Sequence, residues 1–93
     1  MPVEVRLPTL LRAAAGGRSA VSVDGATVRE VLVALGAEHP GLAGQLLTED
    51  GALHRFVNVY LDDDDVRYLD GLDTKVADEA VVSILPAVAG GAR

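Results

Sequence analysis

The sequence predicts an α+β domain in which one main helix packs across a mixed sheet of four to five strands. Three observations support this fold class. Short stretches of alternating apolar and polar residues stand before and after one stretch with helical periodicity. The helical stretch begins with a capping motif. Glycine, proline and aspartate mark the joins between the stretches, as they do in turns.

The first two strands are predicted to form a hairpin. Residues 3–7 alternate between apolar and polar side chains, which is typical of a half-buried strand. Residues 19–23 repeat this alternation. The residues between them lead into Gly16-Gly17, a turn signal, so we expect a rather long connecting loop.

The helix is predicted to follow this hairpin. Thr27 and Glu30 form a capping box, in which the Thr27 hydroxyl accepts from the Glu30 backbone N–H and the Glu30 side chain bonds back. Four apolar residues then recur at i, i+3, i+4 and i+7, enough for one face to cover a sheet: Val28, Val31, Leu32 and Leu35. The helix should end near Glu38 and His39 because Pro40 disfavours helical backbone in the residue before it.

The second half of the chain is predicted to be mostly strands. After a short helical turn within residues 41–47, residues 56–61 give the clearest strand. Asp62 to Asp65 is expected to be a turn and residues 66–69 a short return strand. A turn-rich connection leads to the last strand, residues 80–85, whose apolar side chains on both faces indicate a central position in the sheet.

This order of elements is that of the β-grasp fold, the fold of ubiquitin. In that fold the first and last strands pair in parallel at the centre of the sheet, which suits residues 80–85. We expect residues 1–86 to form this single domain and residues 87–93 to be a flexible C-terminal tail.

Composition narrows the possible functions. The chain has 93 residues and no cysteine, which excludes disulfides, thiolate nucleophiles and cysteine-ligated metals. The net charge of −6 argues against nucleic acid as a partner. The acidity suits either simple solubility or a surface that docks on a basic partner. With no apolar run long enough for a bilayer and no signal-peptide pattern at Met1, we expect a soluble cytoplasmic protein.

No metal site is expected. His39 and His54 are not at ligand spacing and are expected at a helix C-terminus and in a loop or strand edge. A calcium loop starting at Asp62 would need glycine at its sixth position and glutamate at its twelfth, where Arg67 and Asp73 stand. The four consecutive aspartates are therefore expected to form a solvated turn.

The most informative segment is the C-terminus. After Pro86 come the small apolar residues Ala87, Val88 and Ala89, then Gly90-Gly91, and then Ala92 and Arg93. Glycine has no Cβ, so the reactive atoms of a partner can approach its backbone closely. We hypothesise that residues 87–90 thread into a partner's channel and that the carboxyl group of Gly91, once exposed, is the reactive group. The alternative is a frayed terminus without a role.

The chain resembles the ubiquitin-like sulfur carriers related to ThiS and MoaD over nearly its whole length. The resemblance includes the first strand, the capped helix and residues 80–91. Its most specific segments are Leu53-His54-Arg55-Phe56-Val57-Asn58-Val59-Tyr60 and Ile84-Leu85-Pro86-Ala87-Val88-Ala89-Gly90-Gly91. Both are most similar to the CysO-type carriers of actinobacterial cysteine biosynthesis.

The resemblance implies a mechanism in which this chain is a protein co-substrate and not an enzyme. A ubiquitin-activating-type enzyme uses MgATP to convert the carboxylate of the terminal glycine, here Gly91, to an acyl-adenylate. Sulfide or a persulfide donor displaces AMP and leaves a thiocarboxylate. In the CysO-type pathway the thiocarboxylate attacks an aminoacrylate held on pyridoxal phosphate by a cysteine synthase. A zinc peptidase of the JAMM type then releases cysteine. MgATP, zinc and pyridoxal phosphate would all belong to partner enzymes.

The sequence departs from the working form of this family because Ala92 and Arg93 follow Gly91. We expect a precursor that a metallopeptidase or another protease trims between Gly91 and Ala92. The alternatives are that Arg93 is itself the working terminus, or that the extension is an artefact.

Three functional hypotheses stay open. The first is sulfur carriage for cysteine, molybdopterin, thiamine or a thio-containing secondary metabolite. The second is a ubiquitin-like modifier joined to lysines of other proteins, and the third is a non-covalent interaction module with an inert tail.

Overall fold

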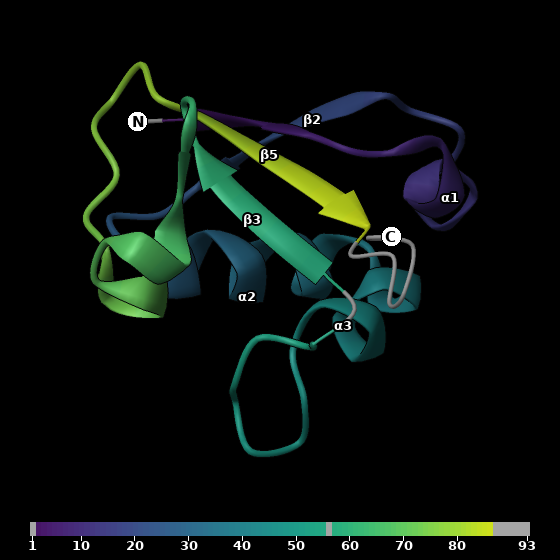
Figure 1. Ribbon diagram of the computed structural model, residues 1–93. Helices are drawn as coiled ribbons and strands as arrows, with labels where there is room; N and C mark the ends of the chain where they lie inside the picture. Colours follow the sequence, from purple (N-terminus) through teal and green to yellow (C-terminus); the bar gives the residue numbers. More distant parts are fainter. Residues whose placement is uncertain (1, 56, 87–93) are drawn as a thin grey trace, which may run out of the picture.

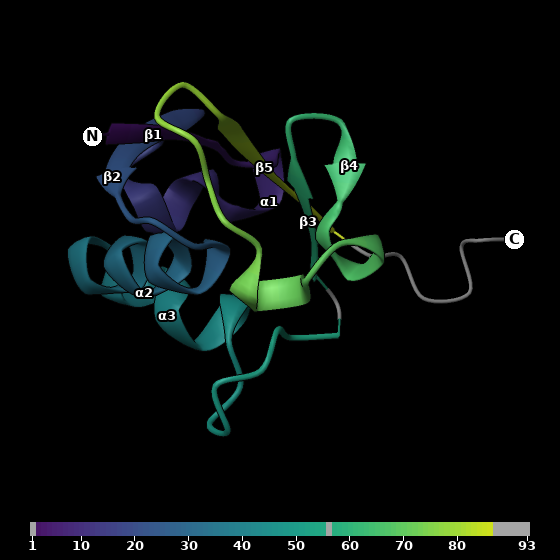
Figure 2. The same ribbon diagram turned by 90° about the vertical axis from the view of Figure 1, so that its left-hand side faces the viewer.

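A computed structural model describes residues 2–55 and 57–86 as a mixed five-stranded sheet in the order β2-β1-β5-β3-β4, with helices packed against one face (Figures 1 and 2). The elements in chain order, with η for 3-10 helices, are β1 (Pro2–Arg6), α1 (Thr9–Arg12), η1 (Ala13–Ala15), β2 (Ala20–Asp24), α2 (Val28–Glu38), α3 (Pro40–Leu46), β3 (Val57–Leu61), β4 (Asp64–Asp65), η2 (Val66–Tyr68), η3 (Gly71–Asp73) and β5 (Val81–Pro86). The predicted α+β, β-grasp arrangement is confirmed.

Strand β5 holds the central position that its sequence predicts. It pairs in parallel with β1 and antiparallel with β3, while β1 pairs antiparallel with β2 and so forms the predicted hairpin. Its residues Val82 and Ile84 are 0% and 1% exposed and lie in the core. Its other face is not covered in the same way, since Leu85 is 45% exposed. The strand is therefore central because both of its edges are paired.

Helix α2 covers the buried face of the sheet. Its four predicted core residues, Val28, Val31, Leu32 and Leu35, are all 1% exposed or less. The Thr27 half of the capping box forms as predicted, since the Thr27 hydroxyl accepts from the Glu30 N–H at 3.2 Å. The Glu30 carboxylate bonds back one residue before the N-cap, accepting from the Ala26 N–H at 2.8 Å. The helix ends at Glu38, before Pro40 opens α3. None of the helices in residues 2–55 and 57–86 is long and apolar enough to span a membrane.

Helices α2 and α3 approach each other closely at Gly36. A Cβ atom added to Gly36 would lie 3.0 Å from the Cβ of Ala43. The absence of a side chain at residue 36 therefore lets α3 pack against α2 and bury Leu42 and Leu46, both 0% exposed. The short helix predicted within residues 41–47 is confirmed as α3, which begins one residue earlier.

Two local predictions differ from the structure. Residues 66–69, predicted as a return strand, begin with the 3-10 helix η2, because the Asp65 carboxylate caps the Arg67 N–H at 2.9 Å. The return strand is instead β4, which lies inside the predicted Asp62–Asp65 turn and pairs with the end of β3. The loop predicted between the first two strands contains α1 and η1, which form because Leu11 and Ala15 are buried in the core.

Candidate functional site

The structure describes the base of the predicted tail and not the tail itself. The residues predicted to thread, react or be removed all lie outside the described residues: Ala87, Val88, Ala89, Gly90, Gly91, Ala92 and Arg93. The structure places Pro86, the last residue of β5, and the residues around it. The candidate site is therefore built from the surroundings of Pro86.

The domain completes the end of its sheet with its own groups at Pro86. The last pair of the β3–β5 ladder is Val57 with Pro86, and proline has no backbone N–H to donate. The Val57 N–H donates to the His54 carbonyl oxygen at 3.0 Å. The Val57 carbonyl oxygen accepts from Nη2 of Arg67 at 3.0 Å. Both backbone groups of Val57 are thus satisfied within the domain, at the position where the central strand β5 ends.

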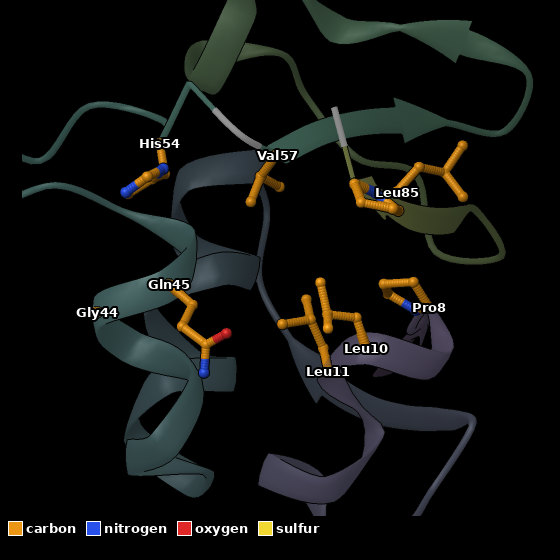
Figure 3. Close-up of a pocket in the computed structure, with 9 residues that line it drawn as sticks. Pro8, Leu10, Leu11, Gly44, Gln45, His54, Val57 and Leu85 are labelled. Carbon is orange, nitrogen blue, oxygen red and sulfur yellow. The ribbon is translucent and has the colours of Figure 1, made fainter. Parts of the chain in front are cut away.

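An apolar groove opens beside Pro86, and we call it the tail-root groove (Figure 3). Its volume is about 190 Å³. Four separate parts of the chain line it: the start of α1, the second half of α3, the start of β3 with the segment before it, and the end of β5. The lining residues are Pro8, Leu10, Leu11, Gly44, Gln45, His54, Val57, Leu85 and Pro86.

The tail-root groove combines buried and exposed apolar side chains. Leu11 and Val57 are 5% and 6% exposed and extend the core, while Leu10 and Leu85 are 75% and 45% exposed. In Figure 3, Leu10 and Leu11 point from α1 toward Val57 across the groove. Large apolar side chains that stay exposed together next to a groove are typical of an interaction surface. The groove is thus suited to receive an apolar side chain of another protein.

The polar groups at the groove serve the fold. The Gln45 side chain donates to the Gly41 carbonyl oxygen at 2.8 Å within α3. The His54 N–H donates to the Leu46 carbonyl oxygen at 2.9 Å, which joins the segment before β3 to α3.

One polar atom near the base of the tail lacks a partner. Asn58 lies opposite Leu85 in the β3–β5 ladder. Its Oδ1 atom is buried and accepts no hydrogen bond from the described residues. A buried acceptor without a donor is costly, so a donor brought by a tail residue or by a partner would be favourable here.

The histidines and aspartates considered as candidate metal ligands lie where they take part in the fold. His39 is the C-cap of α2, the helix end that its sequence predicts, and His54 lies in the segment before β3. The Asp62 carboxylate accepts from the Val81 N–H at 3.1 Å, so it holds β5 in place. Within residues 2–55 and 57–86, no three His, Cys, Asp or Glu side chains are grouped so that they could hold a metal ion.

Sequence reasoning missed the part of the site contributed by α1. Leu10 and Leu11 were expected only to lead into a turn, yet Leu10 is the most exposed apolar side chain of the groove. The adjacent residues Leu10 and Leu11 indicate an exposed apolar side chain, because a single helical turn can bury one of them and must expose the other. The signal could not show what Leu10 would face, since its neighbours across the groove come from the other end of the chain.

Comparison with known proteins gives a consistent result over almost the full length. The ThiS family model matches residues 5–91. The chain is 47% identical over 93 residues to sulfur carrier protein CysO of Mycobacterium tuberculosis, covering 98% of this chain and 100% of the relative. It is 42% identical over 93 residues to small archaeal modifier protein 3 of Haloferax volcanii, with the same coverage.

Solved structures share the fold. The CysO structure matched in the crystal structure of the Amycolatopsis orientalis BexX/CysO complex superposes with a TM-score of 0.87 and 46% sequence identity. The match covers 96% of this chain and 99% of that chain. The crystal structure of Mycobacterium tuberculosis CysO gives a TM-score of 0.86, with 45% identity, over 92% of this chain and 99% of that chain.

Proposed function

The chain belongs to the ThiS family, and from this premise we propose that it is a sulfur carrier that donates sulfur from a thiocarboxylate at Gly91. It acts as a protein co-substrate of partner enzymes and is not itself an enzyme. The observation that carries the proposal is the 47% identity with CysO over the full length. The Gly90-Gly91 pair after the last strand supports the assignment of the reactive group.

The proposed chemistry starts at the carboxylate of Gly91, which is a poor electrophile. One carboxylate oxygen attacks the α-phosphorus of MgATP on an activating enzyme, pyrophosphate leaves, and an acyl-adenylate forms. Sulfide then attacks the acyl carbon, and AMP leaves with the bridging oxygen. A persulfide donor would instead form an acyl disulfide, and a second thiol would have to attack its outer sulfur and form a disulfide with it to release the thiocarboxylate. The product is a thiocarboxylate, so the sulfur is carried by the chain terminus and no cysteine is needed. This chain supplies the acyl group, and the partner supplies the nucleotide site.

The proposal includes a processing step, because Gly91 is followed by Ala92 and Arg93. Hydrolysis of the Gly91–Ala92 peptide bond would free the Gly91 carboxylate and release the dipeptide. We propose that a metallopeptidase or another protease performs it. A chain that retains Ala92 and Arg93 has no free carboxylate at Gly91 and should not be adenylated there.

The described structure supports the carrier role through the tail-root groove. A tail that enters a partner's active site brings the partner's surface against the residues around Pro86. The partly exposed Leu10 and Leu85 offer apolar area there, and each leucine that becomes fully buried contributes about 1.5–3 kcal/mol relative to full exposure. We propose that the activating enzyme covers this groove while it holds the tail.

The proposed destination of the sulfur is cysteine, by attack of the thiocarboxylate on an aminoacrylate that a pyridoxal-phosphate-dependent cysteine synthase holds. A JAMM-type zinc peptidase would then release cysteine from the tail. Similarity to CysO favours this route, while molybdopterin, thiamine or a thio-containing secondary metabolite are the alternative destinations. We propose the cytoplasm as the location, where these cofactor-dependent enzymes work.

A second candidate function is covalent modification of other proteins. The 42% identity with small archaeal modifier protein 3 favours it, because a modifier and a sulfur carrier need the same activated glycine. The two functions differ only in the nucleophile that displaces AMP: a lysine amine forms an isopeptide bond, whereas a sulfur donor forms a thiocarboxylate.

Intact-mass spectrometry tests these functions. The full-length chain and a chain ending at Gly91 are each incubated with the host's activating enzyme, MgATP and sulfide. The chain ending at Gly91 should gain the mass difference between sulfur and oxygen, and the full-length chain should not. Isopeptide remnants on host proteins without any thiocarboxylate would favour the modifier. Loading of the chain that retains Ala92 and Arg93 would contradict the processing step.

A further inference from the structure

A second exposed apolar spot lies away from the tail-root groove, at Tyr68 and Leu69. Tyr68 is 87% exposed and Leu69 is 42% exposed, at the end of the 3-10 helix η2. η2 packs against η3 beside the outer edge of β3 (Figure 2). An almost fully exposed tyrosine next to an exposed leucine is unusual on a small domain, and tyrosine is among the residues that most often anchor protein interfaces.

The surroundings of this spot carry the whole net charge of the protein. Residues 62–79, which we call the acidic segment, contain eight carboxylates and two cations, so their formal charge is −6, equal to that of the entire chain. The rest of the chain holds six acidic and six basic residues and is neutral. Every residue of the acidic segment belongs to the described part of the structure.

The two cations of the acidic segment leave most of its carboxylates exposed and unpaired. The Arg67 guanidinium donates to the Val57 carbonyl oxygen at 3.0 Å. From outside the segment, the Arg29 guanidinium lies 3.5 Å from the Asp73 carboxylate. Asp63, Asp64 and Asp70 are exposed, and no described residue forms an ion pair with them. The apolar spot therefore belongs to a segment whose negative charge is largely uncompensated.

The first residue of the acidic segment and the tail root lie at the two ends of the same strand. The Asp62 N–H donates to the carbonyl oxygen of Val81, the first residue of β5, at 2.7 Å. Pro86 ends β5 five residues later, which at about 3.3 Å per residue puts the two points about 17 Å apart. Figure 1 shows the green segment beside the start of β5 and the arrowhead of β5 at the opposite end. A partner that contacts the domain at both ends of β5 would fix the orientation of the domain relative to the partner's active site.

We propose that Tyr68, Leu69 and the carboxylates of the acidic segment form a docking surface for the enzyme that adenylates the tail. The inference rests on the proposed carrier function. Charge complementarity defines the matching surface: an apolar notch for Tyr68, bordered by lysine or arginine. Long-range attraction between these charges guides the encounter, and the aromatic anchor slows dissociation once the surfaces meet.

Two matched sets of charge variants test the guiding role. The first carries Asp63→Asn, Asp64→Asn and Asp70→Asn; the control carries Glu38→Gln, Glu49→Gln and Asp50→Asn, three exposed carboxylates outside the acidic segment. Both have the same net charge. Association with the purified activating enzyme is followed by stopped-flow fluorescence over a range of salt concentrations. The first set should associate about tenfold more slowly at low salt and respond less to salt, while the control stays near wild type.

Tyr68→Ser tests the anchor, and it should raise the dissociation rate about tenfold with little change in the association rate. ATP–pyrophosphate exchange with chains ending at Gly91 is measured separately. Equal association rates for the two charge sets, or an unchanged dissociation rate for Tyr68→Ser, would overturn the docking surface even while exchange proceeds. Normal salt-dependent binding without any exchange would overturn the proposed function and leave the docking surface in place.

Discussion

The two ends of strand β5 present opposite kinds of surface. At the tail root the domain offers an apolar groove with Leu10 and Leu85 partly exposed. The acidic segment, whose first residue Asp62 bonds to the other end of β5, holds exposed Tyr68 and the carboxylates that account for the full net charge. Apolar contact acts only on touching and responds little to moderate salt, whereas charge acts over about 10 Å at 0.1 M salt. The contrast teaches that one small domain can separate the surface that guides a partner from the surface that holds it.

The largest expected effect comes from damage to the strand that joins the two ends. Ile84→Ala removes a side chain that is 1% exposed, in the middle of the core. It should lower the free energy of unfolding by about 3 kcal/mol through lost transfer energy and a residual cavity. Urea denaturation measures the change, with Ser83→Ala on the other face as the control. A loss below about 1 kcal/mol would contradict the packing described for β5.

Gly91→Ala should slow the proposed thiocarboxylate formation without changing the stability of the domain. The added methyl group displaces the carboxylate within the adenylation site, and a misplacement of about 1 Å can cost about 100-fold in rate. The rate of thiocarboxylate formation is measured by mass spectrometry on chains that end at residue 91. The free energy of unfolding should stay within about 0.5 kcal/mol of wild type. Loading at the normal rate would contradict the steric argument.

Arg67→Ala sharpens the comparison because this residue belongs to the acidic segment while its guanidinium reaches Val57 beside the tail root. Loss of a hydrogen bond from a charged donor should destabilise the domain by about 1.5 kcal/mol, and the Val57 region should exchange amide hydrogens faster. Arg18→Ala, which removes an exposed arginine in the loop before β2, is the control for charge. If both variants lost the same stability, the bond to Val57 would contribute nothing.

Leu10→Ser has the smallest expected effect and tests the tail-root groove alone. Leu10 is 75% exposed, so the fold should be unaffected, while binding to the activating enzyme should weaken about fivefold. The ratio to wild type should be the same at low and high salt, unlike that of the acidic-segment variants. Val33→Ser, an exposed apolar residue of α2, is the matched control. A strong salt dependence for Leu10→Ser would show that the two ends do not act separately.

Local periodicity predicted the main elements because their patterns coincide with their environments. The apolar residues of α2 recur at helical spacing, and the parallel pairing of β1 with β5 follows from the order of elements. Residues 66–69 were misassigned because apolar and polar side chains alternate there as in a strand. The capping bond from Asp65 and the burial of Val66 decide the conformation instead, and alternation alone does not reveal either.

The sequence predicted the reactive end of the candidate site but not the groove beside it. The Gly90-Gly91 pair can be read directly from the end of the chain, although it lies outside the described residues. The tail-root groove could not be read, because Leu10, Gln45 and Leu85 are far apart in the sequence and meet only in the fold. The position of the acidic segment relative to Pro86 likewise depends on the bonds between Asp62 and Val81.

The closed end of the β3–β5 ladder has a consequence for how a loaded chain is told from an empty one. Val57 has both backbone groups satisfied inside the domain, and Pro86 contributes no donor, so the described ladder does not rely on Gly91. We therefore expect that the proposed exchange of an oxygen for sulfur at Gly91 leaves the shape of the folded domain unchanged. The folded domain would present the same surface to partner enzymes in every chemical state of the terminus. Enzymes that must distinguish carboxylate, adenylate and thiocarboxylate have to read the terminal atoms themselves.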